Sequence, residues 1–192
     1  MNRTVVAGRA LVASLMVLVS LTACSAQDGG TTAYTVPPGG SGEVKIGASM
    51  LTLSIRSLQC GQQARAEITE KIDYNRDKLG DAPAEWLGGP PAGSQFCVLT
   101  LEVTNTGGEP VVWSLQDAPV SLNVGERRYE SLGQARQLNQ DFSQWASAEG
   151  LPNANFGINP GESGPDFTVF AIPEGARPTA VQVGDHLLFE LP

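Results

Sequence analysis

The sequence has few of the residues that catalytic and metal sites commonly use. It contains one histidine and three cysteines. No Gly-x-Ser-x-Gly elbow precedes His186, so a Ser-His-acid triad is not indicated, and the few cysteines lack the repeated spacing of a zinc site. No glycine pair is followed by the Lys-Ser/Thr of a phosphate-binding loop. We therefore expect a protein that is not an enzyme.

Long hydrophobic runs are also missing. The apolar run ALVASLMVLVSL at residues 10–21 is well short of the roughly 20 residues that a membrane-spanning helix needs. Arg3 and Arg9 precede it without any acid, and small and polar residues follow it. This order is typical of a secretory signal, so residues 1–23 are predicted to be removed from the mature protein.

The residues directly after the apolar run are Leu21-Thr22-Ala23-Cys24. They resemble the lipobox of bacterial lipoproteins, in which leucine, two small residues and cysteine are recognised together. The resemblance implies cleavage before Cys24, a diacylglyceryl thioether on its sulfur and usually acylation of the new amino terminus. Two or more acyl chains make a stable anchor, so we expect a cell-membrane protein that is lipid-anchored on the extracytoplasmic face.

The charge of the chain disfavours polyanions as partners. Lysine and arginine number 12 against 20 acidic residues, a net charge of −8; without Arg3 and Arg9 the mature chain has 10 against 20, or −10. Such a surface is repelled by nucleic acid, so no nucleic-acid partner is expected.

The mature chain divides into a short polar segment and one domain. Residues 25–42, SAQDGGTTAYTVPPGGSG, are rich in glycine and proline and have no apolar periodicity. With the lipidated Cys24 they are predicted to form a flexible tether, residues 24–42. Residues 43–192 are long enough for one domain with its own core.

Two cysteines remain beside Cys24. Cys60 and Cys97 are an even pair in a chain with an export signal, which favours a disulfide. The alternative is a reactive or metal-binding thiol pair, which lacks supporting histidines. A bond between them would close the base of an insertion at residues 61–96, and we do not expect it to join two sheets as in antibody domains.

Period-two alternation dominates the domain. Within residues 43–60, Leu51, Leu53 and Ile55 alternate with polar residues, after which Leu58 and Cys60 fall on the opposite parity, so we expect a bulge or two covered faces. The other predicted strands are residues 96–105, 111–115, 119–124, 127–130, 166–172, 179–183 and 186–191. Short strands separated by Gly/Pro turns predict an all-β antiparallel sandwich or barrel.

Two segments depart from this rhythm. In residues 62–81, Ala64, Ile68 and Ile72 recur at four-residue spacing, which predicts one short helix. In residues 132–146, a helical face would carry three large apolar side chains, the last of them Trp145. Both segments are expected to be helical insertions that cover an edge or end of the sandwich.

The strand and turn motifs MLTLSI, CVLTLEVTNTGGEPV, NVGERRYE and INPGESGPDFTVFAIPEGARP carry a second resemblance. Together they resemble the telokin-like, immunoglobulin-like domain of unknown function found in exported lipoproteins and secreted antigens of Gram-positive bacteria. The resemblance covers most of the mature chain. It implies an immunoglobulin-like antiparallel β-sandwich of two packed sheets, and no common activity.

One acidic segment has the spacing of a possible calcium site. Asp73, Asn75, Asp77 and Asp81 occupy the first, third, fifth and ninth positions of an EF-hand-like loop, whose oxygen ligands would suit calcium. The pattern lacks the glycine of the sharp turn and the final bidentate glutamate. A solvated acidic helix end is the competing interpretation, and no other cofactor is expected.

Trp86 and Trp145 lie in the irregular segments, where a large ring anchors a partner or fastens its segment to the core. We therefore predict a non-enzymatic binding or interaction module at the cell envelope, with an envelope or extracellular protein as partner. The alternative is a small-ligand or calcium-binding envelope protein that uses residues 61–96. An envelope enzyme would require titratable groups gathered around His186 or the acidic insert.

Overall fold

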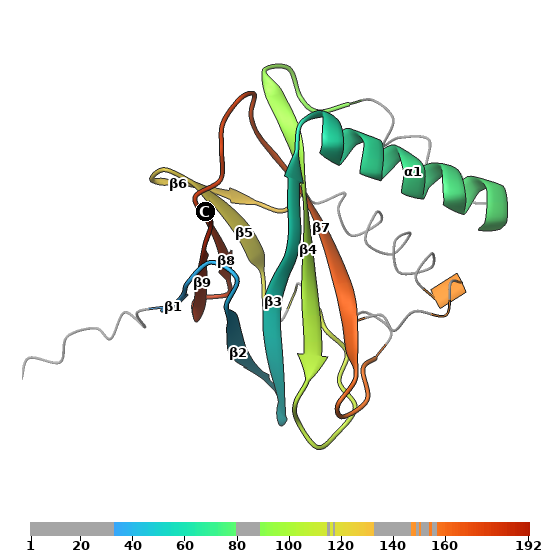
Figure 1. Ribbon diagram of the computed structural model, residues 1–192, viewed down its shortest axis with the longest axis vertical. Helices are drawn as coiled ribbons and strands as arrows, with labels where there is room; N and C mark the ends of the chain where they lie inside the picture. The colour runs from blue at the N-terminus through green and yellow to red at the C-terminus, as the bar shows by residue number, and fades with distance from the viewer. Residues whose placement is uncertain are drawn as a thin grey trace, which may run out of the picture. The chain divides into compact units, whose positions relative to one another are not determined.

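The structure is a computed structural model that describes residues 33–79, 89–114, 116, 118–132, 147–148, 150, 154 and 157–192. Within these residues the strands form two sheets, with the orders β1-β9-β8-β5-β6 and β2-β3-β4-β7 (Figure 1). The elements are β1 (Tyr34–Val36), β2 (Ser41–Ile46), β3 (Ser49–Cys60), α1 (Gln62–Leu79), β4 (Ser94–Asn105), β5 (Val120–Val124), β6 (Arg127–Glu130), β7 (Ser163–Pro173), β8 (Ala180–Val183) and β9 (Leu187–Glu190). The predicted all-β sandwich is confirmed.

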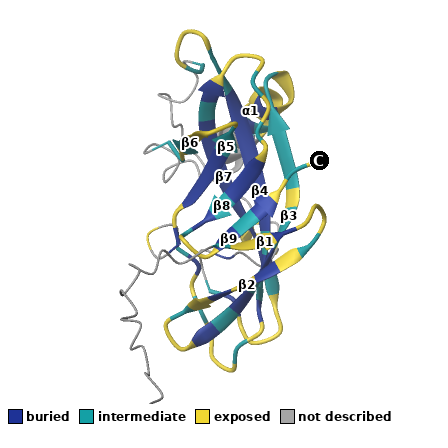
Figure 2. Cartoon of the chain, turned by 90° about the vertical axis from the view of Figure 1, so that its left-hand side faces the viewer, coloured by how far each residue is buried: buried dark blue, intermediate teal, exposed yellow. Residues whose placement is uncertain are grey.

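The inner faces of the two sheets form the main core. Alternate residues of β3, β4 and β7 point inward and meet the inward residues of β5, β8 and β9, as period-two alternation requires. The largest fully buried side chains include Trp113, Phe170 and Phe189. Figure 2 shows β4 and β7 as almost continuous buried strands, because their outer faces are covered as well.

The helix covers part of that outer face. Ala64 and Ile68 of α1 are buried in a second cluster with residues of β4 and β7, namely Phe96, Val98, Phe167 and Val169. The predicted helix in residues 62–81 is therefore confirmed, with its end at Leu79. The second predicted helix, residues 132–146, lies almost wholly outside the described residues.

The expected parity change in β3 is a β-bulge. The pairing of β3 with β4 shifts between Ile55 and Ser57, which leaves Arg56 as the extra residue. One extra residue exchanges the two faces of a strand. This allows Leu58 and Cys60 to pack against the same core as Leu51.

The predicted tether is wrong for residues 34–42. β1 pairs in parallel with β9, its Val36 is only 1% exposed, and β2 already begins at Ser41. Gly42, which had suggested a linker, is a packing residue, because a Cβ there would lie 2.9 Å from a Leu187 methyl carbon. Residues 1–32, including the predicted signal and Cys24, lie outside the described residues.

The predicted strand at residues 111–115 is also wrong for its described residues, 111–114. Val111 makes only an isolated bridge with Ile158, and the Trp113 amide donates to the Ala154 carbonyl at 2.9 Å. Trp113 of this segment is buried in the core, whereas its neighbour Val112 is exposed. No helix in the described part of the chain is long and apolar enough to cross a membrane.

Candidate functional site

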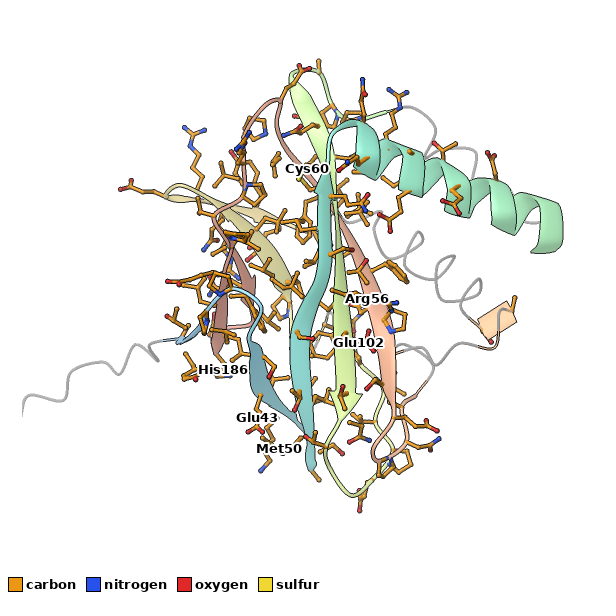
Figure 3. The ribbon with its side chains drawn as sticks, in the orientation of Figure 1. Glu43, Met50, Arg56, Cys60, Glu102 and His186 are labelled. Atoms are coloured by element: carbon orange, nitrogen blue, oxygen red, sulfur yellow. A yellow bond between two sulfur atoms is a disulfide. The ribbon has the colours of Figure 1, made fainter. Side chains whose placement is uncertain are left out.

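A disulfide joins the ends of two neighbouring strands. Cys60, the last residue of β3, lies opposite Cys97 of β4, and their sulfur atoms are 2.01 Å apart (Figure 3). The predicted bond is confirmed, and it lies within one sheet, unlike the bond of antibody domains. The next backbone contact, from the Gly61 amide to the Phe96 carbonyl at 2.9 Å, continues the pairing beyond the bond.

The disulfide fixes the point at which the chain leaves the sheet. Gly61 has a φ of 67°, a left-handed conformation that favours glycine, and α1 begins at the next residue. Ala64 then packs against the sheet, so the first turns of α1 are held close to the start of β4. We call this region of Cys60, Gly61, the start of α1 and the start of β4 the disulfide end.

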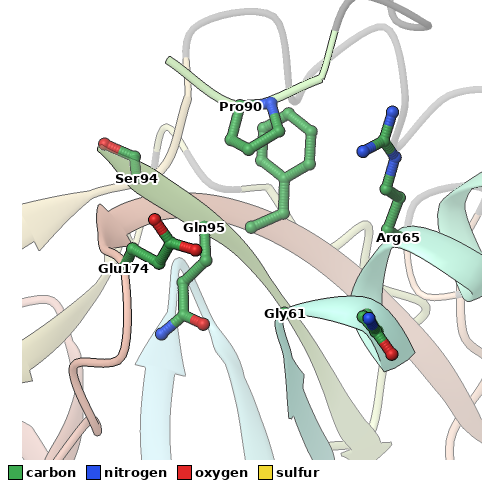
Figure 4. Close-up of a pocket in the computed structure, with 8 residues that line it drawn as sticks. Gly61, Arg65, Pro90, Ser94, Gln95 and Glu174 are labelled. Carbon is green, nitrogen blue, oxygen red and sulfur yellow. The ribbon is translucent and has the colours of Figure 1, made fainter. Parts of the chain in front are cut away.

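A pocket of about 180 Å³ opens at the disulfide end (Figure 4). Phe96 and Pro90 supply apolar surface to it. Its other lining residues come from three parts of the chain: Gly61, Gln62 and Arg65 around the start of α1, Ser94 and Gln95 at the start of β4, and Glu174 directly after β7. The fold thus brings together residues more than 100 positions apart.

Gln95 is the fixed polar group of this pocket. Its side-chain nitrogen donates to the Ala176 carbonyl at 2.8 Å and lies 3.4 Å from the Pro173 carbonyl. These contacts tie the start of β4 to the β7–β8 connection. The side-chain oxygen of Gln95 faces Gly61, and a Cβ added at Gly61 would lie 3.2 Å from this oxygen.

The pocket carries one charge of each sign. Figure 4 shows Arg65 on one side and Glu174 on the other, with Gln95 between them. Among the described residues, no ion pair joins these two side chains and none of the hydrogen bonds involves the guanidinium or the carboxylate. Both charges are therefore available to a bound molecule.

Sequence reasoning pointed to the 61–96 insertion but did not single out these residues. Glu174 belongs to the PEGARP turn, which gave only a turn signal, and Arg65 is an ordinary solvent-facing helix residue. No local pattern relates the two, because their proximity depends on the pairing of β4 with β7.

A buried polar pair inside the sandwich was missed as well. The Trp113 indole nitrogen donates to an Asp166 carboxylate oxygen at 2.8 Å, and both residues are almost completely buried. Asp166 and Phe170 point to the same face of β7, the face that packs in the core. A charged residue at such a position was the only sequence signal for this pair. The pair fastens the 111–114 segment to β7 and lies away from the pocket lining.

Three of the four proposed calcium ligands have a helical backbone. Residues 73, 75 and 77 lie within the continuous helix α1. A continuous helix differs from the turned backbone that an EF-hand loop requires. These three residues therefore have a helical backbone where a loop was expected, while Asp81 lies outside the described residues, and calcium binding stays a prediction. Among the residues that are described, no group of three His, Cys, Asp or Glu is placed to hold a metal.

The remaining predicted site residues are distributed as follows. Trp86, Trp145 and Cys24 lie outside the described residues. His186 is exposed at the start of β9, where its carbonyl accepts a hydrogen bond from the Tyr34 amide at 2.7 Å. Figure 3 places it far from Cys60, so the pocket at the disulfide end does not include the histidine.

Comparison with known proteins supports the fold. No protein-family model matches the chain, and no curated protein matches it. A solved structure of MPT63, a secreted protein from Mycobacterium tuberculosis, has a TM-score of 0.50 at 15% identity, covering 84% of this chain and 99% of that one. An uncharacterised β-sandwich protein from Clostridium difficile 630 has a TM-score of 0.42 at 11% identity, covering 83% and 95%. The chain therefore has the β-sandwich fold seen in a secreted mycobacterial protein.

Proposed function

We propose that this protein is a lipid-anchored extracytoplasmic lipoprotein whose β-sandwich is a non-enzymatic binding module, with the disulfide end as its binding surface. The observation that carries the proposal is the pocket, which presents one group of each charge, not paired with each other or with another described residue, beside the disulfide. Concave sites with a few fixed polar groups are where proteins commonly bind ligands and partners.

An extracytoplasmic location agrees with the chemistry of the chain. A signal-like N-terminus precedes Cys24, and the domain contains a disulfide, which persists in oxidising compartments. The β-sandwich is also the fold of the secreted mycobacterial protein. The lipobox-like residues 21–24 support a lipid anchor on Cys24.

The strand order places the first strand residue, Tyr34, and the pocket at opposite ends of the sandwich. Tyr34 pairs with Leu187, and Leu187 pairs with Val183 at the end of β8. Glu174 precedes the opposite end of β8, so the chain enters the sandwich at the end remote from the pocket. Only nine residues, 25–33, separate Cys24 from Tyr34. Even fully extended they span about 32 Å.

The anchor is tested by labelling cells with an alkyne analogue of palmitate and separating membranes from medium. The native protein should carry label and remain with the membranes. The C24A variant should lose the label and leave the membrane fraction. Label in C24A, or an unlabelled native protein, would contradict the lipid anchor.

The binding surface is tested by photo-crosslinking in intact cells. A photoreactive residue at the exposed Gln62 places the probe on the pocket rim, and one at the exposed Lys45 of β2 is the matched control at the other end of the sheet. We expect one reproducible adduct from position 62 and none from position 45. Equal capture at both positions would show that the disulfide end is not the binding surface.

A further inference from the structure

We propose that the pocket at the disulfide end binds a small zwitterion of amino-acid size, with its carboxylate at Arg65 and its ammonium group at Glu174. This inference rests on the proposed binding role and names the ligand class of the same site. It follows from the charges, the fixed amide and the size of the pocket.

The two charges stand on separate supports. Arg65 lies one turn into α1, which is held on the sheet by Ala64 and Ile68. Glu174 directly follows β7, in a connection that Gln95 holds through the Pro173 and Ala176 carbonyls. Because no ion pair joins them among the described residues, they do not neutralise one another. A ligand with one charge of each sign would form an ion pair with each of the two side chains.

The groups between the charges suit the middle of such a ligand. The side-chain oxygen of Gln95 accepts hydrogen bonds, and an ammonium group is a donor with three hydrogens. The hydroxyl of Ser94 both donates and accepts. Phe96 and Pro90 add apolar surface for a short hydrocarbon portion.

The volume of the pocket matches a ligand of a few heavy atoms. A cavity of roughly 150 Å³ holds one benzene molecule, and this pocket measures about 180 Å³. Nucleotides and sugars of several rings would extend beyond the pocket. An amino acid, or one end of a short peptide, matches both the volume and the charge pattern.

The test is isothermal titration calorimetry on the full chain, purified in detergent. The ligands are glycine, L-alanine, L-leucine, 4-aminobutanoic acid and 6-aminohexanoic acid, which vary the spacing between the two charges. Propionate and propylamine are the singly charged controls. We expect at least one zwitterion to bind with a Kd of about 1 mM or lower, and both controls to bind at least tenfold more weakly.

Two variants assign the charges. R65Q and E174Q should each raise the Kd of the best zwitterion at least tenfold, since each removes a charge-assisted hydrogen bond. R127Q on β6 and E43Q on β2 remove exposed charges outside the pocket lining and should leave the Kd unchanged. Arg65 and Glu174 are exposed, so their variants should fold, which an unchanged unfolding midpoint verifies.

Three results would overturn the inference: no zwitterion binding at 10 mM, equally tight binding of a singly charged control, or a Kd unaffected by both R65Q and E174Q. None of them would by itself contradict the proposed function. If one of these results is obtained together with a specific crosslink from position 62 in cells, the binding module stands and only the zwitterion is rejected as its ligand.

Discussion

Replacing Cys60 and Cys97 together by alanine tests the role of the disulfide in stability. The two residues are 37 positions apart, so the bond closes a loop of 38 residues in the unfolded chain. The loop-entropy relation gives a loss of about 13 cal/mol/K, which is about 4 kcal/mol at 25 °C. We expect the free energy of unfolding to fall by nearly this amount.

The structure explains why the effect should arise in the unfolded state. β3 and β4 stay paired from Leu51 opposite Asn105 to the cysteines themselves, so the folded sheet does not need the bond for its register. Alanine is chosen because Cys97 is fully buried, and serine would place a hydroxyl in the core.

The assay is urea and thermal unfolding followed by circular dichroism, with and without reductant. For a domain of this size each kcal/mol shifts Tm by roughly 2–4 °C, so the variant should melt about 8–16 °C lower. Reductant should lower the Tm of the native protein and leave the variant unchanged. A variant within 1 kcal/mol of the oxidised native protein would refute the loop-entropy argument.

Three further predictions concern other parts of the sandwich. W113F should lower the free energy of unfolding by about 2–3 kcal/mol, because the buried Asp166 carboxylate loses its indole donor; a change below 0.5 kcal/mol in urea unfolding would refute this role. G42A should cost about 1–3 kcal/mol, since its Cβ would lie 2.9 Å from a Leu187 methyl carbon, whereas G108A has no atom within 4 Å and should cost less than half as much. Equal losses in both glycine variants would show that packing at β2 does not require glycine. Thermal unfolding in millimolar calcium and in chelator should give the same Tm, because α1 replaces the predicted binding loop; a higher Tm in calcium would restore the calcium hypothesis.

Local periodicity predicted most of the strands because alternation along one strand reflects which face is buried. The same signal detected the parity change at Arg56, and the structure resolved it as a bulge. It failed at 111–115, where Trp113 is buried in the core and Val111 makes only an isolated bridge. It failed also at β1, whose three residues are too short for a visible period and stand among linker-like residues.

The candidate site was predictable only in part. The even pair of cysteines indicated a disulfide at the base of the 61–96 insertion, and that bond is present. The pocket beside it was not predictable, because Arg65 and Glu174 have no common motif and meet only through strand pairing. Gly42 gave a misleading signal, since a glycine in a linker and a glycine under a packed leucine look the same in sequence.

By itself the sequence determined the features encoded by neighbouring residues: the alternating strands, the first helix and the even pair of cysteines. It also predicts an export signal and a lipobox-like segment, which lie outside the described residues. Only the tertiary structure decided the sheet order, the inclusion of residues 34–42 in the sandwich, the buried Trp113–Asp166 pair and the pocket of mixed charge. The physical reason is the range of the interactions. Periodicity and signals act over a few residues, whereas register, close packing and a binding surface arise from contacts between distant parts of the chain.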